Sequence, residues 1–395
     1  MKDHPPVAIT GIGCLSAAGL NLEENIESLF QRNGKAASPR RFSSSHSVSY
    51  PVFEVFEEEG IVESNVSRTS RLGLMAALEA LNDAEWTPQK LSQKRTGVCI
   101  GTTVGSAMNN EAFYREYREG LHPDMAVIER FLNSNPASTI AREFGLTGPC
   151  QTVVNACSSG TDAIGIGASW IRSGISDVVI CGGADELCRV TYNGFISLMI
   201  TDKSTCKPFD RDRKGLNLGE GAAILILESE DTVRERENQI RSFVLGYGSA
   251  SDGYHLTAPH PDGQGLKEAL GVALTNSGVS IEDIAFVNAH GTGTPDNDRV
   301  EGRVLSEMLT GVPFLSTKGY TGHTLGAAGA IEAAFTVGCL EAGRVPASAG
   351  FTTLDPDVSV SPVSQPITLT RNIAISESLA FGGHNSALVF GKEKE

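Results

Sequence analysis

Short apolar segments that end in glycine or another small residue alternate along the chain with segments of helical character. In the first part of the chain these apolar segments are residues 7–13, 97–103, 151–156, 177–184 and 222–228. They are apolar at nearly every position, which is typical of strands covered on both faces. The pattern therefore predicts an α/β fold in which helices cover both sides of a sheet.

The pattern restarts after residues 228–242, a highly charged helical segment without an apolar stripe that we interpret as a connector. Residues 243–250 resemble the opening strand, and further strands are predicted at 285–294, 313–323 and 386–392. We therefore predict two similar halves, residues 1–240 and 241–395, each built from strands and helices.

Composition and charge indicate which binding partners and which cellular compartment to expect. The 395 residues are too many for one small core, and the formal net charge of −15 argues against nucleic acid or an anionic membrane as the main partner. The eight cysteines show neither a CxxC pair nor zinc-site spacing, so no metal is expected. Asp3 and two prolines near the start are unlike a secretory leader, and the most apolar window, Leu325 to Leu340, contains Glu332 and is short for a membrane span. We expect a cytoplasmic protein with reduced thiols.

Cys157 directly follows the predicted strand 151–156 and begins a helix that we expect to end near Arg172. Free backbone N–H groups and the positive dipole end of a helix lower the pKa of a thiol at such a place. A buried packing cysteine and a reactive nucleophile both fit this position. Three glycines weaken the helix and indicate close approach of another backbone or a ligand: Gly160, Gly165 and Gly167.

Two later loops have the same design. His290 ends one predicted strand, Lys318 ends another, and His323 begins an Ala/Gly-rich helix. A single histidine is usually structural, but two at strand-to-helix junctions favour a shared cavity. Glu332 is the only charged residue between positions 324 and 340, so it either pairs, with Lys318 as the natural partner, or extends outward to solvent. This set of residues suits covalent acyl chemistry in which imidazole N–H groups stabilise an enolate oxygen.

Four segments, "NACSSG", "HGTGTPDND", "STKGYTGHTLGAAGAIEA" and "FGGHNSALVF", resemble the β-ketoacyl-[acyl-carrier-protein] synthases, above all those of the synthase II type. "PASTIAREFGLTGPC", "KPFDRDRKGLNLGEGAA" and "SDGYHLTAPHPDG" match as well, so the resemblance covers nearly the whole chain in order. It implies the thiolase fold, with two pseudo-repeated halves in five αβαβα layers. It also implies a homodimer formed through the first half, or a heterodimer with a related subunit.

The resemblance implies a role for each candidate residue. Cys157 would accept the acyl group, and the backbone N–H groups of Cys157 and Phe381 would form the oxyanion hole. His290 and His323 would promote decarboxylation of a malonyl group, with Lys318 and Glu332 fixing the geometry and electrostatics around His323. The substrate-binding residues that it implies are Thr257, Thr292 and Thr294 along the phosphopantetheine arm, with Phe195 and Asn110 at the acyl pocket.

By resemblance, the acyl group passes from an acyl carrier protein to the cysteine, and malonyl-carrier then loses CO2 and attacks the thioester. The product is a 3-oxoacyl carrier two carbons longer, in fatty acid biosynthesis or in a specialised polyene or polyketide pathway. Substrates arrive on the phosphopantetheine of the carrier, and no metal or redox cofactor is implied.

Three departures from the family pattern stand out. Ala380 replaces a usual glycine before Phe381, which predicts a stiffer gating loop. Asn110 in place of an aliphatic residue predicts a pocket for a short, polar or conjugated acyl chain, unless the alignment there is shifted. Met199 replaces an arginine thought to meet the carrier, which leaves Arg68, Arg71 and Lys203 as candidates for a basic docking patch.

Rival interpretations explain fewer of these residues. A non-catalytic subunit of the chain-length-factor type would lack the cysteine. A papain-like hydrolase would give the second histidine and the lysine no role. A thiolase that uses coenzyme A would carry a second cysteine near "FGGHN".

Overall fold

The computed structural model describes residues 5–32, 34, 36–56, 66–103, 110–358 and 360–392. Its described strands form one ten-stranded sheet in the order β3-β2-β4-β5-β1-β6-β12-β11-β7-β8, and a separate ribbon of β9 and β10. The strands are β1 (Val7–Ser16), β2 (Thr96–Gly101), β3 (Cys150–Val153), β4 (Val178–Asp185), β5 (Gly221–Glu228), β6 (Ser242–Ser251), β7 (Ile284–Asn288), β8 (Phe314–Leu315), β9 (Arg344–Val345), β10 (Ile367–Thr368), β11 (Ile373–Ala380) and β12 (His384–Gly391).

The sheet repeats one arrangement twice. The first five strands stand in the order β3-β2-β4-β5-β1, and the last five mirror them as β6-β12-β11-β7-β8, so that β1 corresponds to β6 and β3 to β8. β1 and β6 meet antiparallel in the middle of the sheet, where Val7 pairs with Val244. The two pseudo-repeated halves are thereby confirmed. Their division into separate domains at residue 240 stays a prediction, because one sheet runs through both.

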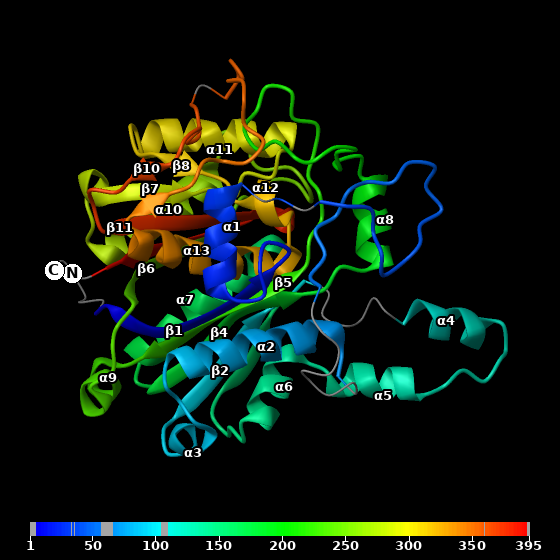
Figure 1. Cartoon of the computed structure of the whole chain (residues 1–395), viewed down its shortest axis with the longest axis horizontal. Coiled ribbons are helices and arrows are strands. Elements are labelled where there is room, and N and C mark those ends of the chain that lie inside the picture. Colours follow the sequence, from blue (N-terminus) through cyan, green and yellow to red (C-terminus); the bar gives the residue numbers. More distant parts are fainter. Residues whose placement is uncertain are drawn as a thin grey trace.

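Helices form three layers around the two halves of this sheet (Figure 1). α7 and α13 pack between the halves, α2 and α6 cover the outside of the first half, and α10 and α11 cover the outside of the second. This is the predicted αβαβα thiolase fold. The helices are α1 (Leu22–Gln31), α2 (Arg68–Asp83), α3 (Pro88–Leu91), α4 (Glu111–Arg118), α5 (Ala126–Asn133), α6 (Pro136–Glu143), α7 (Ser159–Arg172), α8 (Arg189–Ser197), α9 (Glu230–Arg236), α10 (Gln264–Ser277), α11 (Pro295–Met308), α12 (Lys318–Thr321) and α13 (Ala328–Ala342).

The central helices are rich in glycine and alanine because their backbones lie close together. A Cβ atom at Gly160 of α7 would lie 2.8 Å from the backbone nitrogen of Ala330 in α13. A Cβ at Gly165 would lie 2.4 Å from the ring of Tyr247 on β6. Both positions confirm the close approach expected from the sequence.

Several elements differ from the sequence prediction, including β8, the charged connector and β11. The strand expected over 313–323 is only two residues long, because the chain turns into α12 at Lys318. The charged connector is helical only from Glu230 to Arg236. β11 was not predicted, since the serines and the glutamate in "IAISESLA" interrupt its apolar pattern although the strand is almost fully buried.

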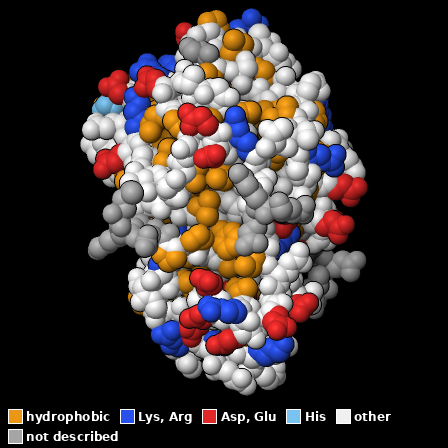
Figure 2. Space-filling model, turned by 90° about the vertical axis from the view of Figure 1, so that its left-hand side faces the viewer, with side chains coloured by type: hydrophobic (Ala, Val, Ile, Leu, Met, Phe, Trp, Pro, Cys, Tyr) orange, Lys and Arg blue, Asp and Glu red, His pale blue; other side chains and the backbone are white. Residues whose placement is uncertain are grey.

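One stretch among the described residues, Leu325–Ala342, is long and apolar enough to cross a membrane, and 89% of it is buried inside the protein. Core helices of soluble proteins have this character. On the face shown in Figure 2, lysine and arginine side chains alternate with acidic ones around a central apolar strip, so this face carries no continuous basic surface. The cytoplasmic location stays a prediction.

Candidate active site

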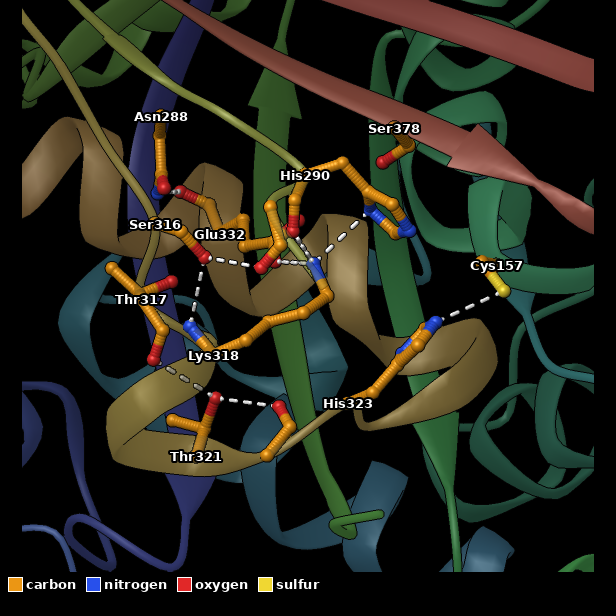
Figure 3. A network of polar contacts seen from close by, with 12 residues as sticks. Cys157, Asn288, His290, Ser316, Thr317, Lys318, Thr321, His323, Glu332 and Ser378 are labelled. Carbon is orange, nitrogen blue, oxygen red and sulfur yellow. Dashed lines mark hydrogen bonds and ion pairs between the residues drawn. The ribbon is translucent and has the colours of Figure 1, made fainter. Parts of the chain in front are cut away.

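Cys157 lies in a single 3₁₀ turn, Ala156–Ser158, between β3 and α7. Ala156 just before it has a φ of +48°, a left-handed conformation that costs a residue with a side chain on the order of 1 kcal/mol. This strained turn directs the thiol into the interior, where the residue is only 5% exposed (Figure 3). Such turns are typical of nucleophiles held between a strand and a helix.

His323 reaches the same place from the second half of the chain. It follows β8 and α12, and Leu325 with a φ of +54° then leads into α13. Because β8 corresponds to β3 in the strand order, the His323 loop is the counterpart of the Cys157 loop. Its Nε2 lies 3.1 Å from the Cys157 Sγ (Figure 3).

His290 completes a buried triad. It follows β7, and its ring centre lies 5.2 Å from that of His323, with the ring planes nearly perpendicular. One ligand-type atom of each of Cys157, His290 and His323 lies within 4.8 Å of the others. The structure therefore brings together the nucleophile and both histidines that the sequence singled out.

The hydrogen bonds of the two rings assign their tautomers. The His323 Nδ1 accepts the N–H of Leu325 at 3.2 Å, and the His290 Nδ1 lies 3.0 Å from the Lys318 Nζ, which can only donate. The proton of each ring therefore sits on Nε2. Burial and the positive charge of Lys318 hold the pKa of both imidazoles well below the usual range, so both rings are neutral Nε2–H donors.

Lys318 is almost fully buried and binds two partners. Its Nζ contacts the carboxylate of Glu332 and donates to the carbonyl oxygen of His290 at 2.5 Å (Figure 3). The predicted pairing of Lys318 with Glu332 is confirmed. The predicted electrostatic effect on His323 is supported, because the charge of Lys318 lowers the pKa of that ring. The histidine that the lysine side chain contacts is His290, at the end of β7.

The thiol itself differs from expectation. Burial raises the pKa of Cys157 to about 11, although a hydrogen bond from the Phe381 backbone N–H and the charge of Lys318 lower it. The predicted low pKa is therefore wrong for the resting cavity, since removal of water outweighs the effect of the helix start. Two donors nevertheless face the sulfur, the Phe381 N–H and the His323 Nε2–H, and both stabilise a thiolate once it forms.

This titration gives a prediction. The rate at which iodoacetamide alkylates Cys157 should rise roughly tenfold per pH unit from about pH 7 to pH 10, because only the thiolate reacts. Mass spectrometry of the peptide that contains Cys157 measures the rate, and the exposed Cys150 serves as an internal control for reagent quality. A rate that levels off below about pH 8 would contradict the high pKa.

The loop at Phe381 closes one side of the site. Ala380 has a φ of −121°, ordinary extended backbone, and the positive φ angles fall on Gly382 and Gly383. The alanine is thus unstrained in this conformation, and a stiffer loop stays a prediction. The N–H of Gly382 donates to the carbonyl of Leu256 at 2.8 Å. The rings of Phe195 and Phe381 stack with centres 5.7 Å apart.

A cavity of about 280 Å³ opens in front of the sulfur. Asn110 does not line it; the residue is buried at the start of α4, and residues 104–109 before it lie outside the described chain. Its place at the pocket floor therefore stays a prediction. The predicted site residues that do line the cavity are Cys157, Phe195, Thr257, His290, Thr292, Thr294, His323 and Phe381.

The candidate docking residues separate into buried and exposed ones. Arg68 is bound to Glu220 with a side chain only 9% exposed, so its assignment to a carrier-docking patch is wrong. Arg71 is partly buried, whereas Lys203 is exposed. Met199 is 87% exposed and lines the cavity.

The triad does not suit a metal ion, although sulfur and imidazole ligands at this spacing are typical of zinc sites. Metal binding through Nε2 would move each ring proton to Nδ1. There it would face the N–H of Leu325 and the ammonium group of Lys318, which already donate to those nitrogens.

Two buried carboxylates that support the site were missed from sequence. Glu301 on α11 accepts the backbone N–H groups of His290 and Gly291 at 2.6 and 2.8 Å. Asp185, at the end of β4, accepts the N–H of Gly326 at 2.7 Å beside the His323 loop. An acidic residue directly after an apolar strand was the available signal for Asp185. Nothing in the charged segment around Glu301 marks it as buried.

Known proteins match the chain over nearly its full length. Residues 4–232 match the family "Beta-ketoacyl synthase, N-terminal domain" and residues 241–352 match "Beta-ketoacyl synthase, C-terminal domain". The "3-oxoacyl-[acyl-carrier-protein] synthase 2" of Synechocystis sp. is 31% identical, covering 98% of both chains. The "Tetracenomycin polyketide synthase ketoacyl synthase alpha subunit" of Streptomyces glaucescens is 34% identical, covering 84% of this chain and 83% of its own.

Among solved structures, "The ishigamide ketosynthase/chain length factor" superposes with a TM-score of 0.93 at 30% identity, covering 98% of this chain and 99% of the other. Both family domains, the full-length relatives and this fold agree with the arrangement of cysteine, histidines and lysine. The chain therefore belongs to the β-ketoacyl synthase family of acyltransferases and is of the synthase II type.

Proposed function

We propose that this protein condenses an acyl group held on Cys157 with a malonyl group held on the phosphopantetheine of an acyl carrier protein. The products are a 3-oxoacyl carrier, CO2 and free carrier. The observation that carries the proposal is the buried triad, in which the His323 Nε2 lies 3.1 Å from the Cys157 Sγ and a ring nitrogen of His290 lies within 4.8 Å of both residues.

The first step is acyl transfer. The sulfur of Cys157 attacks the carbonyl carbon of the acyl-carrier thioester, and the thiol proton leaves with the sulfur of phosphopantetheine. The backbone N–H groups of Cys157 and Phe381 hold the oxyanion that develops. Because the thiol is protonated at rest, the donors that face the sulfur act mainly while the bond is being exchanged.

The second step is decarboxylation and condensation. The bond between the malonyl methylene and its carboxylate breaks, CO2 leaves, and the electron pair forms an enolate. The Nε2–H groups of His290 and His323 donate to the enolate oxygen. The enolate carbon then attacks the Cys157 thioester and expels the thiolate, which takes up a proton from water to restore the resting thiol. Bonds and electrons then balance without a cofactor.

Reconstitution tests this function. The purified chain, an acyl carrier and a malonyl carrier labelled in its free carboxyl group should give labelled CO2 and a product two carbons longer, measured by mass spectrometry. Release of the free acid without elongation would indicate a hydrolase. Lack of acylation at Cys157 would indicate a non-catalytic subunit.

A polyketide or polyene pathway is a second candidate, supported by similarity to the tetracenomycin and ishigamide proteins. The acyl group trapped on Cys157 in cells, identified by mass spectrometry, separates the two. A saturated chain favours fatty acid biosynthesis, and a conjugated or poly-oxo chain favours the other pathway.

A partner subunit is part of the proposal. β3 is the edge strand of the sheet, and α4 and α5 project from the body (Figure 1) without a buried residue. Their exposed apolar side chains would be covered by a second copy or a related subunit. The molecular mass of the purified chain in solution distinguishes a homodimer from a monomer that needs another subunit. The exposed apolar residues of this region are Tyr114, Tyr117, Leu121, Met125 and Leu132.

A further inference from the structure

β11 carries a carboxyl group for which the proposed reaction has no direct use. Glu377 is the only charged residue of this strand, and its side chain is completely buried. Neither of its oxygens receives a hydrogen bond from a donor among the described residues. The polar group that faces it is the carboxyl of Glu301 on α11.

Of the two carboxyl groups, Glu301 receives more hydrogen bonds. It accepts the backbone N–H of His290 and of Gly291, and the side-chain amide of Asn297 at 3.0 Å. Three donors favour the ionised form of Glu301, whereas an ionised Glu377 would be a buried charge without a donor. Of the two, Glu377 is therefore the protonated carboxyl, and its O–H has Glu301 as acceptor.

The surrounding charges support this assignment. Asp298 lies beside Glu301 on α11, Glu332 approaches Glu377 from α13, and Lys318 supplies a positive charge that Glu332 already neutralises. Burial, followed by the charge of Glu301, raises the pKa of Glu377 well above its usual range, and burial raises the pKa of Glu301 to about 7.

We propose that Glu377 is a positioning residue whose O–H bridge to Glu301 ties the backbone of His290 to β11. β11 ends at Ala380, directly before Phe381, so one shared proton links the loop of a proposed enolate donor to the strand of a proposed oxyanion donor. The inference rests on the proposed function of His290 and Phe381. Loss of the proton at alkaline pH places two like charges in contact and displaces the His290 loop.

Malonyl decarboxylation by the Cys157→Ala protein, measured between about pH 6 and pH 10, isolates this effect from the thiol. Glu377→Gln keeps a donor that cannot dissociate, so its rate at pH 7 should stay within about twofold of the parent, and the decline of the parent at alkaline pH should disappear. Glu377→Leu removes the donor and should lower kcat at pH 7 about tenfold, with KM changed less than about twofold. An alkaline decline that is the same in the parent and Glu377→Gln would refute the role.

Two readouts do not depend on the reaction. The infrared difference spectrum between the parent and Glu377→Gln at neutral pH should contain the C=O stretch of one protonated carboxyl group that only the parent has; a difference spectrum without this band would refute the bridge. The second readout is stability. Above pH 4.5, Glu377 keeps its proton in the native state and loses it in the unfolded chain, so the free energy of unfolding of the parent should fall as pH rises. The melting temperature should fall less between pH 5 and pH 8 in Glu377→Gln, and an equal fall would contradict the assignment. These results stand even if no decarboxylation is found.

Discussion

Replacing Cys157 with alanine should abolish condensation while malonyl decarboxylation persists or increases. Cys157 is the one cysteine among the described residues that line the cavity, and its sulfur lies 3.1 Å from an imidazole that has a second task in the enolate step. Hydrogen bonds to the Nδ1 atoms orient both rings, from the Leu325 N–H to His323 and from the Lys318 Nζ to His290. The Nε2–H groups therefore keep their orientation without the sulfur. We expect condensation to fall by about 10⁴-fold or more, the range found when a covalent nucleophile is removed.

Product mass and labelled CO2, followed in the same reaction, measure both activities. Cys339→Ala is the matched control, because Cys339 is also buried but lies in α13 away from the cavity. It should elongate acyl chains normally. Residual elongation by Cys157→Ala at a rate near that of the control would disprove the nucleophile assignment.

The second large effect is expected at the histidines. His290→Ala and His323→Ala should each slow decarboxylation by about 10²- to 10³-fold, the loss typical of one missing donor to a developing oxyanion. Cys157 should still become acylated in both proteins, because the Phe381 N–H remains as a donor to the sulfur; acylation should be slower in His323→Ala, which loses the second donor. Acylation is measured as the mass increase of the intact chain, and decarboxylation as labelled CO2.

A matched substitution separates a hydrogen-bond donor from a base. His290→Gln keeps an N–H group but cannot take up a proton, so it should retain more decarboxylation than His290→Ala. Equal activity of these two variants would argue against the donor role, and unimpaired decarboxylation in both alanine variants would remove the histidines from the mechanism.

Much of the site could be predicted because its residues stand at the ends of short apolar strands. Cys157, His290 and Lys318 each follow such a strand, and the packing of the two halves brings these strand ends to one cavity. Glu332 was matched correctly with Lys318 because a lone carboxylate on an apolar helix needs a cation. Lys318 does affect His323 through its charge, but its contact with the ring of His290 was not predicted, since sequence spacing does not reveal which ring a long side chain reaches across a cavity.

The remaining errors concern burial. The helix start at Cys157, which lowers the pKa of the thiol, is visible in the sequence. The burial that raises this pKa more strongly arises only when the two halves pack together, so the sequence does not show it. β11 escaped prediction because Ser376, Glu377 and Ser378 are polar although they are buried. The groups that face Ser378 and Glu377 lie on α7 and α11, far away in the sequence. Polar residues of this kind follow no sequence period.

The sulfur and the imidazole that faces it come from opposite halves of the chain, and the helices behind them meet where Gly160 lies against Ala330. Neither half contains a working centre by itself. The distance between the Cys157 Sγ and the His323 Nε2 therefore depends on the packing of the two halves against each other. Catalysis should be lost when this packing is disrupted, before either half of the sheet unfolds.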